Sequence, residues 1–483
     1  MASNKMRSLK VNALLNAVTQ LCKILFPVIT FSYSAHILGA SNIGILNFSA
    51  SIVGYFSMLA MLGIGTYAVR EGASCRNDAD SLSRFASEVF SINVLSMVIS
   101  YILMIILMIS WDFLADYNIY IFIQSLAIIM ATLGANWVNV IYEDFLYLTI
   151  RYISFQVLSI VLLLLFVKSR EDLLVYILIK LFASSGGEFL NFYYIRRYLK
   201  LKLTVHLNLK KHLKPILILF ANEVAVFIYV NSDITILKMF ASDKDVGIYA
   251  TASNLYNVTK RMVYSFIVVA MPRFSFMAAN NTEKMEDLYM RIKNMELIVA
   301  LPVTVGIILA GKEILSVLAG EEFTSGYMAL CILSPAVLLV AYSNLCVLGV
   351  LLPYKQEKIL LFVTCIASCV NIALNFLLIP QYGIEAAAFT TVIAELIVLI
   401  VCNYKAEKFI HASIKRRNVI TVIGGTIGMI ISCLLINNIQ CNDLIMLILK
   451  IVISGIVYWG ILSAIKNEYA ILISKSIIEK MHR

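Results

Sequence analysis

Long apolar runs of roughly twenty residues recur along the whole chain, separated by short polar stretches. A helix of about 20 residues crosses the hydrocarbon core of a bilayer, so this pattern predicts membrane-spanning helices. The polar connections are too short to form a separate soluble domain. The fourteen predicted spans are 11–37, 43–69, 86–110, 119–140, 152–167, 173–195, 215–240, 247–272, 294–311, 327–350, 359–379, 384–404, 419–436 and 444–465.

Composition agrees with this pattern. Of the 483 residues, 61% are hydrophobic and 14% are charged, whereas a soluble domain is about half apolar and a quarter charged. The sequence therefore predicts an all-α polytopic membrane protein. Basic N-terminal residues precede an apolar run that is too long for a signal-peptide core, so we expect a retained first span.

The basic residues predict the orientation. The net charge of +10 is distributed between apolar runs instead of forming one patch, which argues against nucleic acid as a partner. The N-terminal segment and every second loop carry 29 of the 39 Lys and Arg residues, and the loops of the other side carry 4. Because loops rich in Lys and Arg stay in the cytoplasm, both termini are predicted to be cytoplasmic.

A faint internal repeat relates two halves of the chain. The segment 37–50 resembles the segment 239–253, with Gly44-Ile45 aligned to Gly247-Ile248 at an offset of 203 residues. The same offset aligns Arg70 with Arg273. Six spans per copy begin and end on the same side, so the copies would be related by a pseudo-two-fold axis along the membrane normal, with a site at their interface.

Three basic residues lie about halfway along predicted spans: Lys23 in the first span, and Lys260 and Arg261 in the eighth. At that depth a side chain does not easily reach water, so a charge there is a functional candidate. The three cations would suit an anionic substrate such as a diphosphate. The structural alternative is that each cation pairs locally with a carboxylate and only positions helices.

Other basic residues lie nearer the span ends. Lys238, Arg70 and Arg273 are further candidates for contact with a substrate, and each would equally serve as an anchor at the membrane surface. Lys180 and Lys450 lie close to the outer ends of their spans, where we expect their side chains to snorkel to the interface.

Three carboxylates lie well inside predicted spans and are candidates for coupling ion movement to transport: Asp233, Glu223 and Glu395. A carboxyl group in such a place would titrate according to its burial and its neighbouring cations. The alternative is a fixed structural partner for a lysine or for Arg261. Four further acids lie closer to predicted ends and are interpreted as interfacial: Glu88, Glu188, Glu296 and Glu385.

The sequence contains no pattern of a catalytic or metal site. The five histidines lie at span ends or in loops, and the nine cysteines show no metal-ligand spacing and predict no disulfide framework. No glycine-rich phosphate loop with Lys and Ser or Thr is present, so we expect no cofactor and no direct use of ATP.

Three stretches resemble a known family, and the shortest of them is Gly247-Ile248-Tyr249 at the start of the eighth predicted span. The segment 37–73, ILGASNIGILNFSASIVGYFSMLAMLGIGTYAVREGA, resembles the first-hairpin region of bacterial polysaccharide exporters. The segment 371–395, NIALNFLLIPQYGIEAAAFTTVIAE, is similar to their late pattern, carried here by Asn371, Asn375, Pro380, Gly383, Ala386 and Ala387. The whole chain resembles an O-antigen flippase of the multidrug/oligosaccharidyl-lipid/polysaccharide exporter superfamily.

The resemblance implies two six-helix lobes around a central cavity, followed by two extra helices. The expected divisions are 1–205, 206–415, and 416–483 with the last two spans and a cytoplasmic tail. It further implies that an undecaprenyl-diphosphate-linked oligosaccharide moves from the cytoplasmic to the periplasmic leaflet of the bacterial inner membrane by alternating access. The coupling ion would be H⁺ or Na⁺. Membrane lipids, and the polymerase and chain-length proteins of the same pathway, are the other expected partners.

Three other classes of protein remain open. A multidrug cation antiporter of the same superfamily would have a cavity dominated by carboxylates, whereas the middle of these spans is net basic. A membrane polymerase or glycosyltransferase would need a sizeable outer loop with catalytic residues, and the predicted outer loops are short. A lipid scaffold without transport would not need charges at the midplane.

Overall fold

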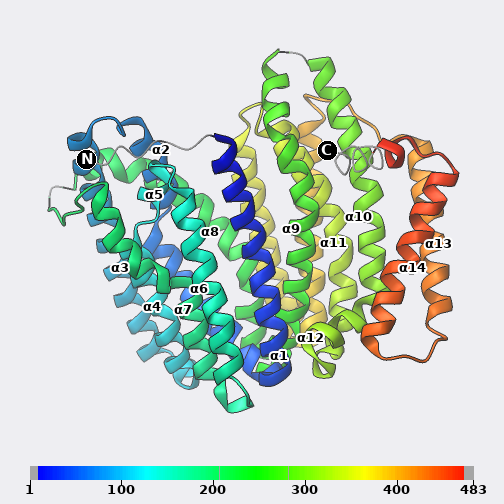
Figure 1. The fold of residues 1–483 in the computed structure, drawn as a ribbon, viewed down its shortest axis with the longest axis horizontal. Coiled ribbons are helices and arrows are strands. Elements are labelled where there is room, and N and C mark those ends of the chain that lie inside the picture. The colour runs from blue at the N-terminus through cyan, green and yellow to red at the C-terminus, as the bar shows by residue number, and fades with distance from the viewer. Residues whose placement is uncertain (1–8, 206, 281, 473–483) are drawn as a thin grey trace. The chain divides into compact units, whose positions relative to one another are not determined.

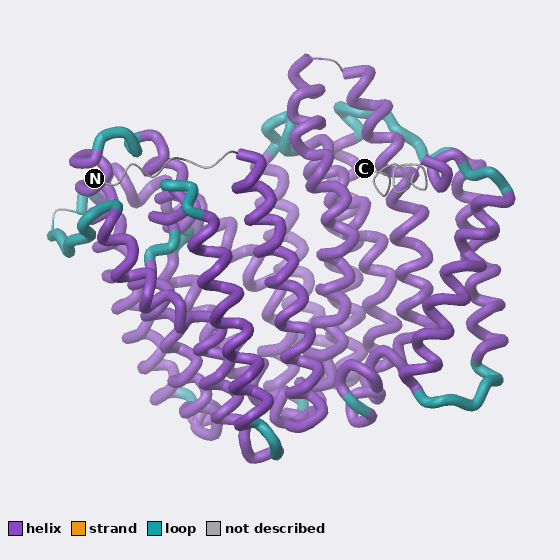
Figure 2. The backbone as a smooth tube through the Cα atoms, in the orientation of Figure 1, coloured by secondary structure: helices purple, strands orange, loops and turns teal. Residues whose placement is uncertain are grey.

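The computed structural model describes residues 9–205, 207–280 and 282–472, and these residues form helices and loops without a strand (Figures 1 and 2). The basic residues Lys5, Arg7, Lys475, Lys480 and Arg483, which contribute to the predicted orientation, lie outside these ranges. The first seven helices are α1 (Leu9–Met61), α2 (Ile64–Ser74), α3 (Ala79–Ser110), α4 (Asn118–Gly134), α5 (Trp137–Ile141), α6 (Phe145–Phe166) and α7 (Leu173–Tyr194). The others are α8 (Leu209–Phe240), α9 (Asp243–Asn280), α10 (Thr282–Ala319), α11 (Tyr327–Cys346), α12 (Glu357–Ala406), α13 (Arg416–Ile436) and α14 (Asp443–Ala464).

Eleven helical segments of the described chain are long and apolar enough to cross a membrane, and the bent pair 243–265 and 270–280 adds a twelfth. Two of these segments contain a break. Helix α1 covers 53 residues and α12 covers 50. As straight helices they would be about 75–80 Å long, which is more than twice the thickness of the hydrocarbon core of a bilayer. Counting each as two spans gives fourteen, so the predicted all-α polytopic fold is confirmed.

Glycine makes both breaks possible. Gly39 interrupts α1 with φ 77° and ψ 173°, and Gly383 interrupts α12 with φ 56° and ψ −129°. These backbone angles are disfavoured for residues that carry a Cβ atom. Gly39 and Gly383 therefore allow the chain to turn sharply between two spans without a longer loop.

The chain divides into two compact units, Met1–Lys238 and Met239–Arg483. The predicted divisions at residues 205 and 415, and the pseudo-two-fold relation between two lobes, stay predictions.

In the first unit, small polar residues of α3 bind the backbone of α1. Asn93 and Ser96 donate to the carbonyl oxygen of Ala60 at 2.8 and 2.6 Å, and Ser100 donates to that of Phe56 at 2.6 Å. In a membrane, where apolar side chains gain little by leaving lipid, close backbone approach and interhelical hydrogen bonds contribute much of the packing. This row of contacts fixes α3 along the second half of α1.

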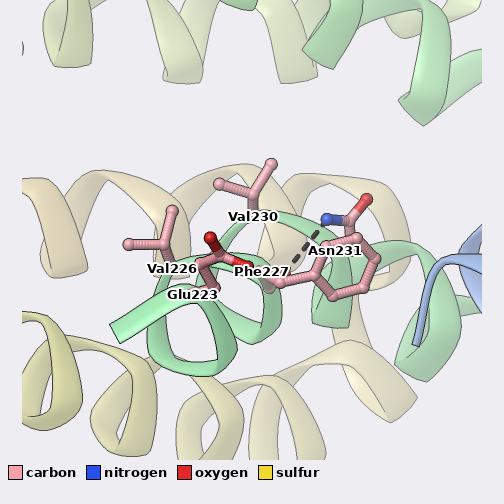
Figure 3. Close-up of a pocket in the computed structure, with 5 residues that line it drawn as sticks. All are labelled: Glu223, Val226, Phe227, Val230 and Asn231. Carbon is pink, nitrogen blue, oxygen red and sulfur yellow. Dashed lines mark hydrogen bonds between the residues drawn. The ribbon is translucent and has the colours of Figure 1, made fainter. Parts of the chain in front are cut away.

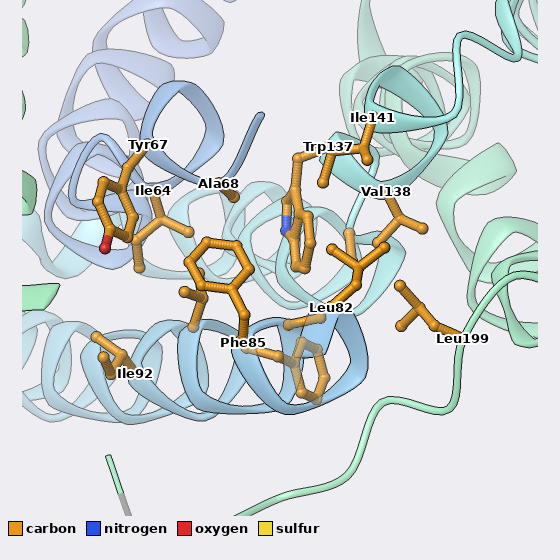
Figure 4. Close-up of a cluster of buried hydrophobic side chains, with 14 of the residues drawn as sticks. Ile64, Tyr67, Ala68, Leu82, Phe85, Ile92, Trp137, Val138, Ile141 and Leu199 are labelled. Carbon is orange, nitrogen blue, oxygen red and sulfur yellow. The ribbon is translucent and has the colours of Figure 1, made fainter. Parts of the chain in front are cut away.

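At one end of the first unit, α2, α3 and α5 share an apolar core (Figure 4). Tyr67 and Ala68 of α2 are buried with Phe85 of α3 and with Trp137 and Val138 of α5. Here the chain packs like the interior of a soluble domain, so the short helices α2 and α5 are held in fixed positions beside the spans.

In the second unit, α9, α10, α11 and α12 share a core that includes Phe274, Tyr289, Leu345, Val363 and Cys402. The last two helices pack on each other and on α10. Tyr458 of α14 donates to the carbonyl oxygen of Ile298 at 2.7 Å, and Asn418 of α13 donates to that of Asn294 at 3.0 Å. The final pair of spans is therefore hydrogen-bonded to α10.

Lys450 of α14 also binds α10. Its side chain is buried, and its Nζ lies 2.6 Å from Glu313 Oε1 and 2.9 Å from the carbonyl oxygen of Leu309. The prediction that Lys450 snorkels to the interface was wrong, because Lys450 pairs with Glu313 of α10. The position of Lys450 within its own span does not reveal this partner.

The break at Gly39 provides a test of the fold. Gly39→Ala is expected to destabilise the protein by about 1–3 kcal/mol, because alanine is strained at this backbone conformation. Gly460→Ala is the matched control, since a Cβ atom at this exposed position of α14 has no neighbour within 4 Å. Thermal unfolding of the purified chain in detergent measures both. Equal unfolding temperatures for Gly39→Ala and Gly460→Ala would contradict a required glycine break.

Candidate functional site

Two of the three predicted midplane cations are exposed. Lys23 of α1 and Arg261 of α9 expose their side chains, and neither forms an ion pair within the described residues. The Nζ atom of Lys23 lies 5.9 Å from the centroid of the Tyr152 ring on α6, within the range of a cation–π contact. These two side chains thus keep their charge available to a ligand.

The third cation, Lys260, has a partner inside the second unit. Its Nζ lies 3.1 Å from Glu395 Oε1 on α12, and the hydroxyl of Tyr256 donates to the same oxygen at 3.0 Å. Lys260 also lies 5.3 Å from the centroid of the Tyr256 ring. The structure therefore brings together two predicted site residues, Lys260 and Glu395, as the local ion pair that the sequence left open. A direct role in substrate binding for either residue stays a prediction.

The remaining basic candidates lie near helix ends. Lys238 on α8 is half-buried, and its Nζ lies 5.5 Å from the centroid of the Tyr117 ring. Arg70 on α2 is exposed and pairs with the neighbouring Glu71 at 3.0 Å. Arg273 on α9 is exposed. Arg70 and Arg273 have the exposure of surface anchors, and their role in substrate entry stays a prediction.

Helix α8 carries the two other acidic candidates. Asp233 is buried, with 5% of its surface exposed. Glu223 is half-buried and lines a pocket of ≈ 360 Å³ with Val226, Phe227 and Asn231 (Figure 3). The carboxyl group of Glu223 thus lies in a largely apolar pocket along α8. Asp233, on the same helix, is buried by packing.

Close packing against α1 holds the pocket-bearing stretch of α8. A Cβ atom on Gly54 would overlap the ring of Phe227, so glycine is what allows the two helices to approach. Thr235 of α8 lies 3.1 Å from the Ser51 hydroxyl and 3.2 Å from the Tyr55 hydroxyl of α1. The side of α8 that packs on α1 is therefore fixed, and Glu223 stands one turn before the Phe227 contact.

A buried histidine fixes the start of α8. Nε2 of His212 lies 2.7 Å from Glu88 Oε2 of α3, and its Nδ1 lies 2.7 Å from the Tyr67 hydroxyl of α2. Asn208 donates to the other Glu88 oxygen at 2.8 Å. His212 is fully buried, so it is part of the core and not the loop residue that the sequence indicated.

Sequence reasoning missed a buried polar network at the break between α4 and α5. Ala135 adopts φ 44° there, and Asn136 donates to Glu188 Oε1 at 2.7 Å. Arg151 of α6 donates to Asn136 Oδ1 at 2.7 Å and lies 3.3 Å from the same Glu188 oxygen. Asn191 donates to the Gly134 carbonyl oxygen at 2.5 Å. The charges of Arg151 and Glu188, on the consecutive helices α6 and α7, thus stabilise an irregular backbone.

A second network lies beside the Gly383 break. Asn375 donates to Asn371 Oδ1 at 3.2 Å, and the Thr390 hydroxyl donates to Asn375 Oδ1 at 2.5 Å. All three residues are buried. The two asparagines were the polar positions of the family pattern, and the structure shows that they link the two halves of α12.

The interfacial interpretation of several acids was wrong. Glu88 and Glu296 are buried in the helical packing, and the half-buried Glu188 pairs with Arg151 of α6. The helices extend well past the apolar runs, because α3 begins at Ala79 and α10 at Thr282. An acid near the end of an apolar run is therefore still surrounded by protein. The only sequence signal for these positions was a charge flanked by apolar residues.

One polar cluster outside the spans involves Tyr198. Its hydroxyl donates to Asp144 Oδ2 at 2.8 Å, and Arg197 donates to the same oxygen at 2.7 Å. Burial raises the pKa of Tyr198, and the hydrogen bond to Asp144 raises it further, although the hydrogen bond from Arg197 lowers it. Tyr198 therefore stays a neutral donor that links the connection after α7 to the loop before α6.

A protein-family model matches the N-terminal part of the chain. The family model described as "Polysaccharide biosynthesis protein" matches residues 9–278, more than half of the chain. A protein of Escherichia coli named "Putative O-antigen transporter" is 23% identical over 82% of this chain and 96% of its own length. A protein of Haloferax volcanii named "Probable low-salt glycan biosynthesis flippase" is 24% identical over 36% of this chain and 37% of its own length.

Solved structures share the fold. The lipid II flippase MurJ in an inward closed conformation aligns with a TM-score of 0.73 and 15% identity, over 93% of this chain and 98% of that structure. An inward-facing multidrug transporter of the MATE family aligns with a TM-score of 0.58 and 15% identity, over 82% of this chain and 97% of that structure. At these identities the alignments establish a common helical architecture.

The Lys260–Glu395 pair can be tested by removing one charge. Glu395→Gln is expected to lower the stability by about 1.5–3 kcal/mol, because the partly buried Lys260 loses a charge-assisted hydrogen bond. Thermal unfolding of the full chain measures this loss. Glu407→Gln, an exposed position at the end of the same helix, is the control. An unchanged unfolding temperature in Glu395→Gln would show that the pair does not hold Lys260 in place.

Proposed function

This chain belongs to the polysaccharide biosynthesis protein family, and from that membership we propose that it is a flippase for a lipid-linked oligosaccharide. The substrate would be an undecaprenyl-diphosphate-linked repeat unit of the O-antigen type. The protein would move it from the cytoplasmic to the periplasmic leaflet of a bacterial inner membrane, with both of its own termini in the cytoplasm. This activity is transport, and no covalent bond of the substrate changes.

The names of the relatives support this proposal. The protein aligned over most of this chain is named an O-antigen transporter, and the second relative a glycan biosynthesis flippase. The shared fold also occurs in a flippase and in multidrug transporters, so the architecture alone does not select the substrate.

The observation that carries the substrate proposal is the exposure of Lys23 and Arg261. A charge exposed about halfway along an apolar helix is costly in lipid and is stable beside water or an anion. A lipid diphosphate supplies that anion: the lysine ammonium would act as a point charge and the arginine guanidinium as a planar set of donors. A drug-cation antiporter would instead expose carboxylates at such depth.

The physical need for such a protein is the desolvation of the head group. A sugar chain with a diphosphate loses its water if it crosses the hydrocarbon core unaided, at a large free-energy cost. A hydrated path along cationic helices would lower that cost while the lipid tail stays in the bilayer. Alternating exposure of the path to the two sides would give directed movement when an ion gradient biases the return step.

For coupling to H⁺ or Na⁺, the predicted carboxylates are not equivalent. Glu395 already accepts from Lys260 and Tyr256, which suits a fixed structural acid. Glu223 is half-buried at the pocket on α8, and Asp233 is buried on the same helix. Of the three, Glu223 is the acid whose pocket offers room for hydration. The pathway polymerase and chain-length proteins stay predicted partners.

The double variant Lys23→Ala/Arg261→Ala tests the substrate proposal. Each lost charge-assisted contact costs about 1.5–3 kcal/mol of binding, so apparent affinity is expected to fall at least about tenfold per cation. The measurement is flipping of an undecaprenyl-diphosphate oligosaccharide in proteoliposomes. Lys23→Arg and Arg261→Lys keep the charge and should retain most of the activity.

Lys168→Ala removes a charge from an exposed loop position and serves as the surface control. Wild-type flipping by the double variant would contradict a cationic substrate site. Transport of small organic cations by the wild type, without movement of the lipid-linked sugar, would instead identify an antiporter.

A further inference from the structure

Glu296 of α10 is a buried acid without a hydrogen-bond partner. Only 3% of its surface is exposed. Neither Oε1 nor Oε2 has a partner within the described chain, and both atoms are inaccessible to solvent. Glu88, Glu188 and Glu395 each have at least one donor, so the environment of Glu296 differs from theirs.

Glu296 forms no ion pair with any residue that the structure describes. Tyr342 and Cys346 of α11 and Tyr289 of α10 are its electrostatic neighbours. The other titratable groups around this part of α10 are Lys293, Glu407 and Tyr458. Lys293 donates to the carbonyl oxygen of Ala412 at 3.0 Å. Glu407 accepts from Asn403 at 2.8 Å, and Tyr458 donates to Ile298.

The elements packed against α10 also leave Glu296 unpaired. No charged side chain in the described parts of α9, α13 or α14, or of the turn 321–326, forms an ion pair with it. On α9, Lys260 instead pairs with Glu395, and on α14, Lys450 pairs with Glu313. Within the described residues, Glu296 therefore has Tyr289, Tyr342 and Cys346 as electrostatic neighbours and no ion-pair partner, and the Lys293 ammonium lies over the Tyr289 ring, 5.9 Å from its centroid.

An ionised carboxylate is strongly disfavoured in such a place, because burial removes its water and nothing replaces it. A proton neutralises the group with no further ligands. A sodium ion would need several oxygen ligands, as hard cations do, and no group of three or more acidic, histidine or cysteine ligands occurs in the described residues. The environment therefore favours a proton over a metal cation.

Glu296 lies near the start of the predicted span 294–311, close to its predicted cytoplasmic end. The last charged residue before it on α10 is Lys293, less than one helical turn away. Beyond it the helix is apolar for several turns. Lys293 lies on the side predicted to be cytoplasmic. The cover over Glu296 is the contact with α11, where the Tyr342 hydroxyl donates to the Lys293 carbonyl oxygen at 3.5 Å, a long hydrogen bond.

We propose that Glu296 is a proton-binding site, neutral while α11 covers it, which releases its proton to the predicted cytoplasmic side when α10 and α11 separate. The step is a simple ionisation: the O–H bond breaks, the electron pair stays on the carboxylate, and water accepts the proton. Its use as the coupling site of transport rests on the proposed flippase function. The site itself, a lone carboxyl that binds H⁺, does not.

Infrared difference spectroscopy of the full chain tests the site directly. The wild-type protein at neutral pH is expected to show the carbonyl stretch of a protonated carboxyl group, and Glu296→Gln is expected to lack that band. Glu321→Gln, at an exposed position of the same unit, is the matched control and should keep it. A band of equal intensity in wild type and Glu296→Gln, or no band in the wild type, would overturn the proposal.

Glutamine has the shape of the neutral acid, so Glu296→Gln should fold. If it does not, Glu296→Asp provides the same test: the band should shift in frequency with the shortened side chain. An unshifted band in Glu296→Asp would show that another carboxyl group is responsible.

Transport in proteoliposomes tests the coupling. A gradient of about one pH unit is a tenfold ratio of proton activity, and the wild-type flipping rate should respond by up to about that factor. Glu296→Gln should lose this response, and Glu321→Gln should keep it. Wild-type flipping without any response would overturn the coupling role and leave the flippase proposal intact. If the infrared band is present but the protein does not flip the lipid-linked oligosaccharide, the flippase proposal is refuted and the proton-binding proposal for Glu296 stands.

Discussion

The cost of placing charge among apolar helices constrains this molecule more than any other interaction. Each buried ionisable group must find a partner, reach water or lose its charge. Lys450 pairs with Glu313, Lys260 with Glu395, and Arg151 with Glu188. Lys23 and Arg261 remain exposed. Glu296 has no hydrogen-bond partner among the described residues, and we propose that a proton neutralises it. Groups that form ion pairs position the helices, whereas the exposed groups and the unpaired Glu296 are the candidate functional groups.

Breaks in the helices are the second organising feature, and buried polar groups accompany two of them. Gly383 has Asn371, Asn375 and Thr390 beside it, and the α4–α5 break has Asn136, Arg151 and Glu188. A break frees backbone groups that lipid cannot satisfy, so irregular backbone inside a membrane requires polar side chains from neighbouring segments. The networks thus explain why asparagine and charge occur within otherwise apolar helices. At the Gly39 break the side chain of Asn42 donates to the carbonyl oxygens of Leu38 at 3.1 Å and Arg170 at 2.7 Å.

Much of the fold could be predicted from the sequence, because span length and hydropathy are local properties. The fourteen spans were found, and the breaks near Gly39 and Gly383 fall between predicted spans. Helix ends were less accurate. The helix α10 begins at Thr282, twelve residues before the predicted span at 294. Hydropathy reports where a helix meets lipid, whereas the helix continues into water as long as other side chains pack on it.

The sequence by itself determined the number of spans, the apolar class of the protein and the positions of Lys23, Lys260 and Arg261 about halfway along their predicted spans, since each depends on position along one helix. Only the tertiary structure decided that Lys260 pairs with a carboxylate and that Lys450 does not snorkel. It also decided that Glu296 is buried with no hydrogen-bond partner among the described residues. Those properties depend on which side chains of other helices lie within a few ångströms of each residue. Residues such as Lys260 and Glu395, 135 positions apart, become neighbours only through helix packing, which periodicity along one segment does not encode.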